Sequence, residues 1–118
     1  MSTHFFTNQA KNLLDSFNAK IEQTEQKGKI TTWEKVTHNN TIYYTHKSTE
    51  WRNEAYFLPK IESDKLTFNI IKPKEKNVTV SVYGYYHGHI IETFLNHFDN
   101  VFSIAHASAG PQAGDVVS

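Results

Sequence analysis

The chain has 118 residues, with twelve basic and twelve acidic side chains and no cysteine. This length suits a single domain whose core is large enough to need neither a metal ion nor a disulfide. The lack of cysteine excludes disulfides, thiolate catalysis and thiolate metal sites. The first residues, Met1 to Phe6, show no basic start and no long apolar run. We therefore expect no signal peptide, no membrane span and a soluble, cytoplasmic protein.

The charges cancel overall but are unevenly distributed along the chain. All twelve lysine and arginine residues lie at or before Lys76, where nine acidic residues leave a net charge of +3, and residues 77–118 carry −3. Arg52 is the only arginine, whereas nucleic-acid-binding domains usually combine arginine with lysine in a basic chain. We therefore expect no nucleic-acid partner. The lysines from Lys60 to Lys76 are interpreted as solvated residues at strand ends and turns.

An N-terminal helix is predicted from Phe6 to Lys27, because apolar residues recur there at every third or fourth position. Gly28 follows as a stop signal. The apolar stripe consists of Phe6, Ala10, Leu13, Leu14, Phe17 and Ile21.

The pattern then changes to a period of two, which predicts five strands. The connections between them are short, which implies antiparallel neighbours, and His38 to Asn40 is typical of a turn. The strands are expected at 30–37, 41–46, 51–58, 65–71 and from 78 to 83 or 85.

A C-terminal helix is predicted from Tyr86 to Phe102. The fold class is therefore α+β, a two-layer domain over residues 1–104 with an N-terminal helix, a five-stranded antiparallel meander sheet and a C-terminal helix. A strongly curved sheet that wraps the second helix and leaves a cavity is the alternative arrangement. Residues 105–118 are expected to form a mobile tail. The expected core contains Leu14, Phe17, Leu66, Phe68, Val80, Val82, Phe94, Leu95 and Phe98.

The segment from Tyr83 to His89 is the densest in groups that can do chemistry, with three tyrosines, two histidines and two glycines. A helix that starts at Gly84 places His87 in its first turn, where unpaired amides and the helix dipole oppose a positive charge. His89 would then point to solvent. His87 is interpreted either as a neutral structural histidine or as an acid–base or ligand-orienting residue. The candidate ligand-binding residues are Tyr83, Tyr85, Tyr86 and His87.

A continuous strand through this segment would have a different consequence. His87 and His89 would share one face and could bind a metal ion with a third ligand from His38 or His46. The helix is favoured, because the apolar stripe after Tyr86 needs a start. We therefore predict neither a metal ion nor a cofactor.

Three functions are compatible with these patterns. The first is a protein-interaction module that forms a homodimer or binds a protein partner through its sheet, because aromatic residues occupy both faces of the first three strands. The second is a small-molecule binder or enzyme with a pocket between the sheet and the C-terminal helix around His87. The third is a histidine metal site. No phosphate-binding glycine loop or nucleophile elbow is present, so an enzymatic activity is neither predicted nor excluded.

Overall fold

The computed structural model describes residues 1–118 and contains two helices and one six-stranded antiparallel sheet. The expected two-layer α+β class is confirmed. In the sheet the strands lie in the order β2-β3-β4-β5-β1-β6. Along the chain the elements are β1 (Thr3–Phe6), α1 (Ala10–Glu22), β2 (Trp33–His38), β3 (Thr41–His46), β4 (Tyr56–Ile61), β5 (Lys65–Ile71), α2 (Val80–Phe98) and β6 (Ile104–Ala107).

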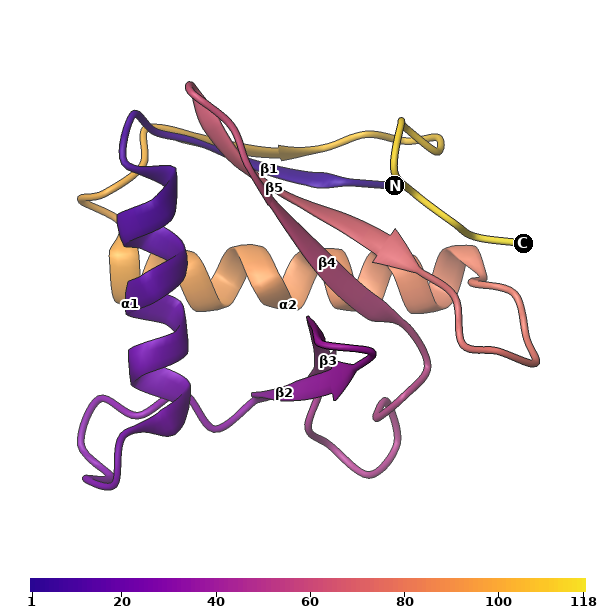
Figure 1. The fold of residues 1–118 in the computed structure, drawn as a ribbon, viewed down its shortest axis with the longest axis horizontal. Coiled ribbons are helices and arrows are strands. Elements are labelled where there is room, and N and C mark those ends of the chain that lie inside the picture. The colour runs from indigo at the N-terminus through magenta and orange to yellow at the C-terminus, as the bar shows by residue number, and fades with distance from the viewer.

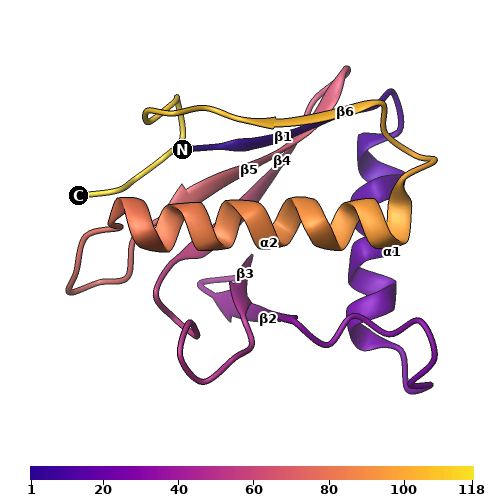
Figure 2. The same cartoon turned by 180° about the vertical axis from the view of Figure 1, so that it is seen from behind.

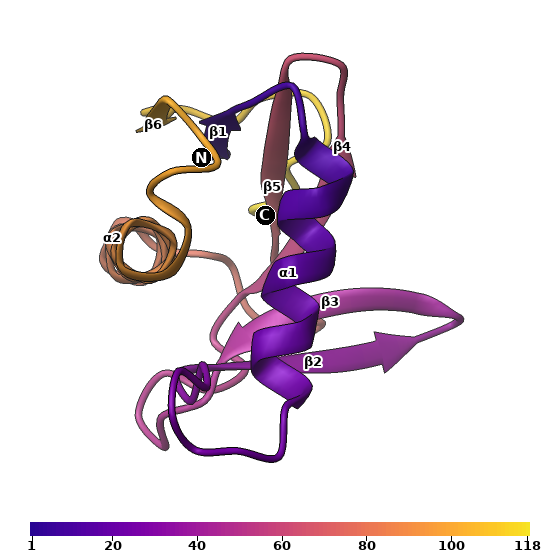
Figure 3. The same cartoon turned by 90° about the vertical axis from the view of Figure 1, so that its left-hand side faces the viewer.

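The sheet is strongly curved and wraps around α2, while α1 crosses one end of the trough that results (Figure 1). Figure 3 shows α2 end-on, with β1 and β6 on one side and β2 and β3 on the other. The curvature agrees with the alternative arrangement, but both helices lie against one face of the sheet, as expected for two layers (Figures 1 and 3). Aromatic side chains fill the space between sheet and helix, among them the fully buried Phe5, Phe57, Phe68, Tyr86 and Phe94.

The fifth predicted strand is wrong, because residues 80–85 form the start of α2. The alternation of Val78, Val80 and Val82 imitates a strand, but Thr79 caps a helix by accepting a hydrogen bond from the Val82 amide at 3.3 Å. The buried stripe of α2 therefore starts earlier and has another phase than expected. Two predicted core residues lie outside it: Val80 is 76% exposed and Leu95 is 51% exposed.

Two strands were not predicted, so the sheet has six strands rather than five and is not a simple meander. β1 lies between β5 and β6, and α1 consequently begins at Ala10 rather than Phe6. β1 and β6 have four residues each and pair across the length of the chain, with Thr3 opposite Ala107. Strands this short, joined by non-local pairing, leave almost no periodic signal in the sequence.

The third predicted strand is shifted towards the C-terminus. β4 begins at Tyr56 and continues through Pro59, which had been expected to end it. β4 pairs with β3 only where Phe57 lies opposite Tyr44, so Pro59 lies beyond that pairing. A proline is tolerated there because no neighbouring strand needs its missing amide proton.

Residues 105–118 lie along the sheet. The first of them belong to β6, and Val116 accepts a hydrogen bond from the Lys72 amide at 2.7 Å and donates one to the Ile70 carbonyl at 2.9 Å. Asp115 accepts hydrogen bonds from the Asn69 side chain and the Ile70 amide. Both termini therefore lie near the same end of the sheet (Figure 2). The mobility of this segment stays a prediction.

The helical assignment of residues 80–85 can be tested with Gly84. This residue lies on the exposed side of α2, where an added Cβ would meet no atom within 4 Å. Because glycine costs a helix about 0.5–1 kcal/mol relative to alanine, Gly84→Ala should raise the free energy of unfolding by that amount in urea titrations. Gly28→Ala is the matched control and should destabilise, since Gly28 has a φ of +75°. A loss of stability in Gly84→Ala would contradict the helix.

Candidate functional site

The four predicted ligand-binding residues all lie in the first half of α2, but they do not converge on one pocket. Tyr83 and His87 lie one turn apart on one side of the helix, with ring centroids 5.5 Å apart. Tyr85 stacks on His89 on another side, at 4.1 Å. Tyr86 is fully buried between them.

Three of these residues use a side-chain polar atom in a contact within the chain, and the fourth, Tyr85, stacks on Trp51 at 3.9 Å. The His87 Nδ1 atom lies 2.8 Å from the Thr3 hydroxyl on β1. The Tyr83 hydroxyl donates to the Ser108 carbonyl, and the Tyr86 hydroxyl donates to the Trp51 carbonyl. The three principal pockets of the structure include none of the four predicted residues. This geometry favours the structural interpretation, in which the four residues tie α2 to the segments around it.

His87 has an unusual acidity that follows from its position. Burial is the largest cause that lowers its pKa to about 4, and the positive charges of the N-terminus and His106 act in the same direction. A neutral imidazole is also what the sequence predicts, but there the start of the helix is the cause. In the structure His87 lies more than one turn beyond Val80, so burial, and not the helix dipole, accounts for it.

His89 does not point freely into solvent, as had been expected, but faces His46 on β3. The His46 Nε2 and His89 Nδ1 atoms are 3.4 Å apart. The Ser48 amide donates to His46 Nδ1 at 3.1 Å, so that atom carries a lone pair and His46 Nε2 carries the proton. A metal ion between the two rings would need a lone pair on each of the two facing nitrogens. His46 Nε2 carries a proton instead, so this pair lacks one of the two lone pairs.

The predicted alternative of a metal site at His87 and His89 needs both rings on one face of a strand. Both residues lie in α2 instead, where a separation of two positions puts them on different sides of the helix. No group of three or more histidine, aspartate or glutamate side chains is placed to hold a metal ion.

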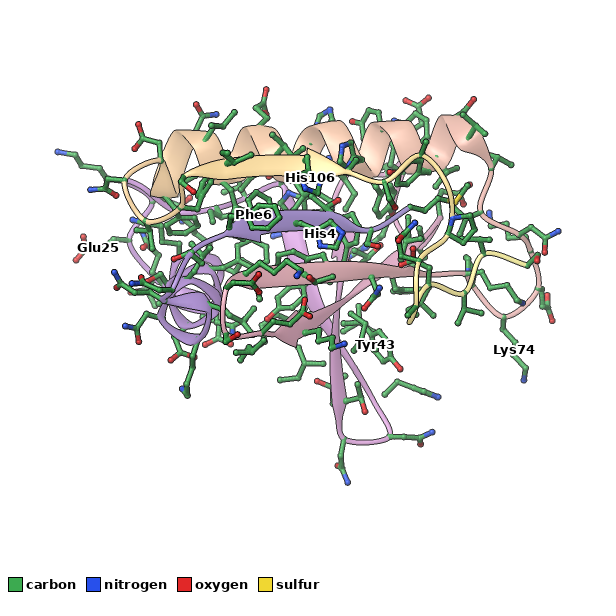
Figure 4. All side chains as sticks on the ribbon, turned by 90° about the horizontal axis from the view of Figure 1, so that it is seen from above. His4, Phe6, Glu25, Tyr43, Lys74 and His106 are labelled. Carbon is green, nitrogen blue, oxygen red and sulfur yellow. The ribbon has the colours of Figure 1, made fainter.

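Another pocket lies on the opposite face of the sheet, which carries no helix. It has a volume of about 360 Å³ and is here called the outer-face pocket. A row of cross-strand neighbours forms part of its lining: Val36 pairs with Tyr43, and Tyr56 pairs with Ile71. Figure 4 labels Tyr43 and Lys74, which belong to its lining. The lining residues are Val36, His38, Tyr43, Tyr56, Ile71, Lys72, Pro73 and Lys74.

The outer-face pocket has positive charges and no carboxylate in its lining. The Lys72 ammonium donates to the carbonyls of Pro73 and Lys74, at 3.3 and 3.4 Å. Neither Lys72 nor Lys74 forms an ion pair, in contrast to Lys76, which pairs with Glu54. The pocket therefore offers an aromatic and aliphatic surface beside two cations that no acidic group neutralises.

The sequence indicates the aromatic part of this pocket but not its lysines. Aromatic residues occupy both odd and even positions of the first strands, which predicts that some of them face outward. Tyr43 and Tyr56 do so, and their rings meet at an interplanar angle of 70°. Trp33 and Tyr44, from the same set, are buried at 1% exposure each. Lys72 and Lys74 were interpreted as solvated residues, because nothing in the sequence indicates that the chain after β5 returns beside the β2–β3 hairpin.

Comparison with protein-family models, with curated proteins and with solved structures gives no match for this chain. Neither α1 nor α2 is long and apolar enough to cross a membrane. Functional inference therefore depends on the geometry of the chain alone.

The acidity of His87 predicts a pH dependence of stability. Its folded-state pKa of about 4 lies below the unfolded value near 6.5, so the unfolded chain binds more protons between these values. The stability that this group contributes is fully present above about pH 6.5 and is lost as the pH falls towards about 4. In thermal unfolding followed by circular dichroism, His87→Gln should flatten the decrease of Tm in this window.

The exposed His38 provides the matched control for that experiment. His38→Gln should retain the wild-type pH dependence, because this side chain lies at the tip of the β2–β3 hairpin and is exposed to solvent in the folded state. An equal decrease of Tm in wild type and His87→Gln would contradict the assignment.

Proposed function

We propose that the protein is an interaction module that binds an acidic segment of a partner protein in the outer-face pocket. The observation that carries this proposal is the combination of an aromatic surface and two unpaired lysines on the sheet face that no helix covers. The cytoplasmic location, and the absence of nucleic-acid and membrane partners, stay proposals from the sequence.

The chemistry of the lining defines the partner. Tyr43 and Tyr56 present an edge-to-face pair, ring centroids 6.2 Å apart, that an apolar or aromatic side chain can contact. Lys72 and Lys74 offer charge-assisted hydrogen bonds to carboxylates that flank such a side chain. The hydroxyl of Tyr43 has no hydrogen-bond partner within the chain and is therefore available to a ligand. An extended peptide with one apolar residue between acidic residues satisfies all of these groups.

The shape of the site favours a peptide over a buried small molecule. Its lining spans four neighbouring strands at the surface of the sheet, from β2 to β5. β2 is also an edge strand, whose outer backbone groups are unpaired and can extend the contact of a bound chain. A small molecule held around His87 is less favoured, since His87, Tyr83 and Tyr86 use polar atoms to bind other segments of the chain.

Self-association is the second candidate, because the chain carries a surface of the required chemistry. On the exposed side of α2, Leu95 is 51% exposed. Glu92 and Asp99 lie on the same side, three positions before and four after it, and are also exposed. This acidic and apolar surface complements the outer-face pocket of another copy.

A binding experiment with a defined probe tests the proposal. The probe is a fluorescein-labelled peptide of about ten residues with one central phenylalanine flanked by glutamate, and its binding is followed by fluorescence anisotropy and NMR shift mapping. We expect saturable, salt-sensitive binding with shifts centred on Tyr43 and Tyr56. Tyr43→Ala and Lys72→Glu should each weaken binding about tenfold, or ~1.4 kcal/mol.

Lys27→Glu is the matched control, because Lys27 is an exposed lysine without an ion pair in the connection after α1. It changes the net charge equally and should leave the affinity unchanged. Equal losses in Lys72→Glu and Lys27→Glu, or tighter binding of an oligonucleotide or of benzoate at this pocket, would contradict the proposal. Sedimentation of the chain alone tests the second candidate: a dimer lost in both Tyr43→Ala and Leu95→Ala identifies another copy as the occupant.

A further inference from the structure

A pair of histidines lies on neighbouring strands at the end of the sheet remote from the outer-face pocket. His4 on β1 and His106 on β6 are directly opposite in the antiparallel register. Their ring centroids are 5.2 Å apart, at an interplanar angle of 64°. Figure 4 shows the two side chains beside each other, next to Phe6. His4 is half-buried and His106 is exposed, so the pair is open to solvent.

The hydrogen bonds around His4 determine which of its nitrogens carries the proton. The Thr67 hydroxyl donates its single proton to Glu62 at 2.6 Å. It must therefore accept the hydrogen bond that it shares with His4 Nδ1 at 3.0 Å, so Nδ1 carries the proton. The Nε2 atom of His4 is left with a free lone pair and has no hydrogen-bond partner within the chain. Neither nitrogen of His106 has one.

We propose that His4 and His106 form a binding site for a divalent transition-metal ion such as Zn²⁺, with water in the remaining positions. Two imidazoles on one tetrahedral zinc, at bonds of about 2.0–2.1 Å, have ring centres about 5 Å apart, close to the observed separation. The chain from His4 through Thr67 to Glu62 orients the ring, as the hydrogen-bond partners of metal-bound histidines commonly do.

The charges around the pair make the site one of modest affinity. Lys65 lies nearby, over the Phe6 ring at 5.8 Å, and its positive charge opposes a cation. Its ammonium is itself paired with Glu62 at 3.8 Å and with Asp64 at 3.5 Å, which offsets part of that effect. Burial, His106 and Lys65 lower the pKa of His4, while Glu62 and Asp115 raise it.

Titration calorimetry of the whole chain with ZnCl₂ alone tests this site. We expect one ion per chain, and NMR shifts confined to the rings of His4 and His106. His106→Ala should abolish the binding, since one imidazole on an open surface holds zinc poorly. Thr67→Val, which keeps both imidazoles but removes the acceptor of Nδ1, should weaken it 10–100-fold.

Two other histidines serve as matched controls. His89→Ala and His38→Ala should leave the zinc affinity unchanged, because His89 belongs to the His46 pair and His38 lies at the tip of the β2–β3 hairpin, on the strand at the opposite edge of the sheet. Loss of binding in His89→Ala, retention in a folded His106→Ala, or one ion per two chains would each overturn the proposal. Circular dichroism is used to check that His106→Ala is folded. We expect it to be, because His106 is exposed and lies on an edge strand.

Discussion

The ring of Phe68 is the contact on which the whole arrangement depends. It is completely buried on β5 and meets five other aromatic rings edge-to-face, at interplanar angles of 61° to 87°. Those rings belong to both helices and to three other strands, so a single side chain is shared by six elements. Edge-to-face contacts prefer centroid distances of about 4.5–7 Å, and all five partners lie within that range. The partners are Phe5, Phe17, Tyr44, Phe57 and Phe94, at 5.6 to 6.1 Å.

This aromatic core explains why the inner face of the sheet carries structural rather than free polar groups. Tyrosine and tryptophan side chains bring hydroxyl and indole N–H groups into the core, and each of these groups needs a hydrogen-bond partner there. The Trp33 indole donates to the Thr93 hydroxyl at 3.0 Å, and no buried side-chain nitrogen or oxygen atom lacks a partner. The tyrosines and histidines between residues 83 and 89 include several such buried groups, whose polar atoms bind other segments of the chain. A segment rich in reactive groups therefore need not be a reactive site. Groups with unused hydrogen-bonding capacity occur on the outer face instead.

The sequence determines the elements whose signals are local. The strand at 41–46 was predicted to the residue, and so was the strand at 65–71, because alternation and flanking turn residues agree there. The prediction is wrong for residues 78–85, because the alternation of valines there competes with the buried helical stripe that starts at Tyr83. The sequence cannot reveal β1 and β6, whose pairing joins the two ends of the chain. The candidate sites have the same origin: parity indicates that some aromatic residues face outward, but only the topology brings Tyr43 next to Tyr56, or His4 opposite His106.

The two histidine pairs show why distance alone does not define a metal site. The ring centroids are 5.0 Å apart in the His46–His89 pair and 5.2 Å apart in the His4–His106 pair, so separation does not distinguish them. The difference lies in the group that contacts the far nitrogen of one ring. A backbone amide donates to His46 and forces its proton towards the neighbouring imidazole, so the two rings bind each other. The Thr67 hydroxyl accepts from His4, because Glu62 takes the only proton that the hydroxyl can give, and the lone pair of His4 faces outward. In the proposed zinc site, the carboxylate of Glu62 lies two hydrogen bonds away from the imidazole and thus leaves the lone pair of His4 Nε2 available to the ion.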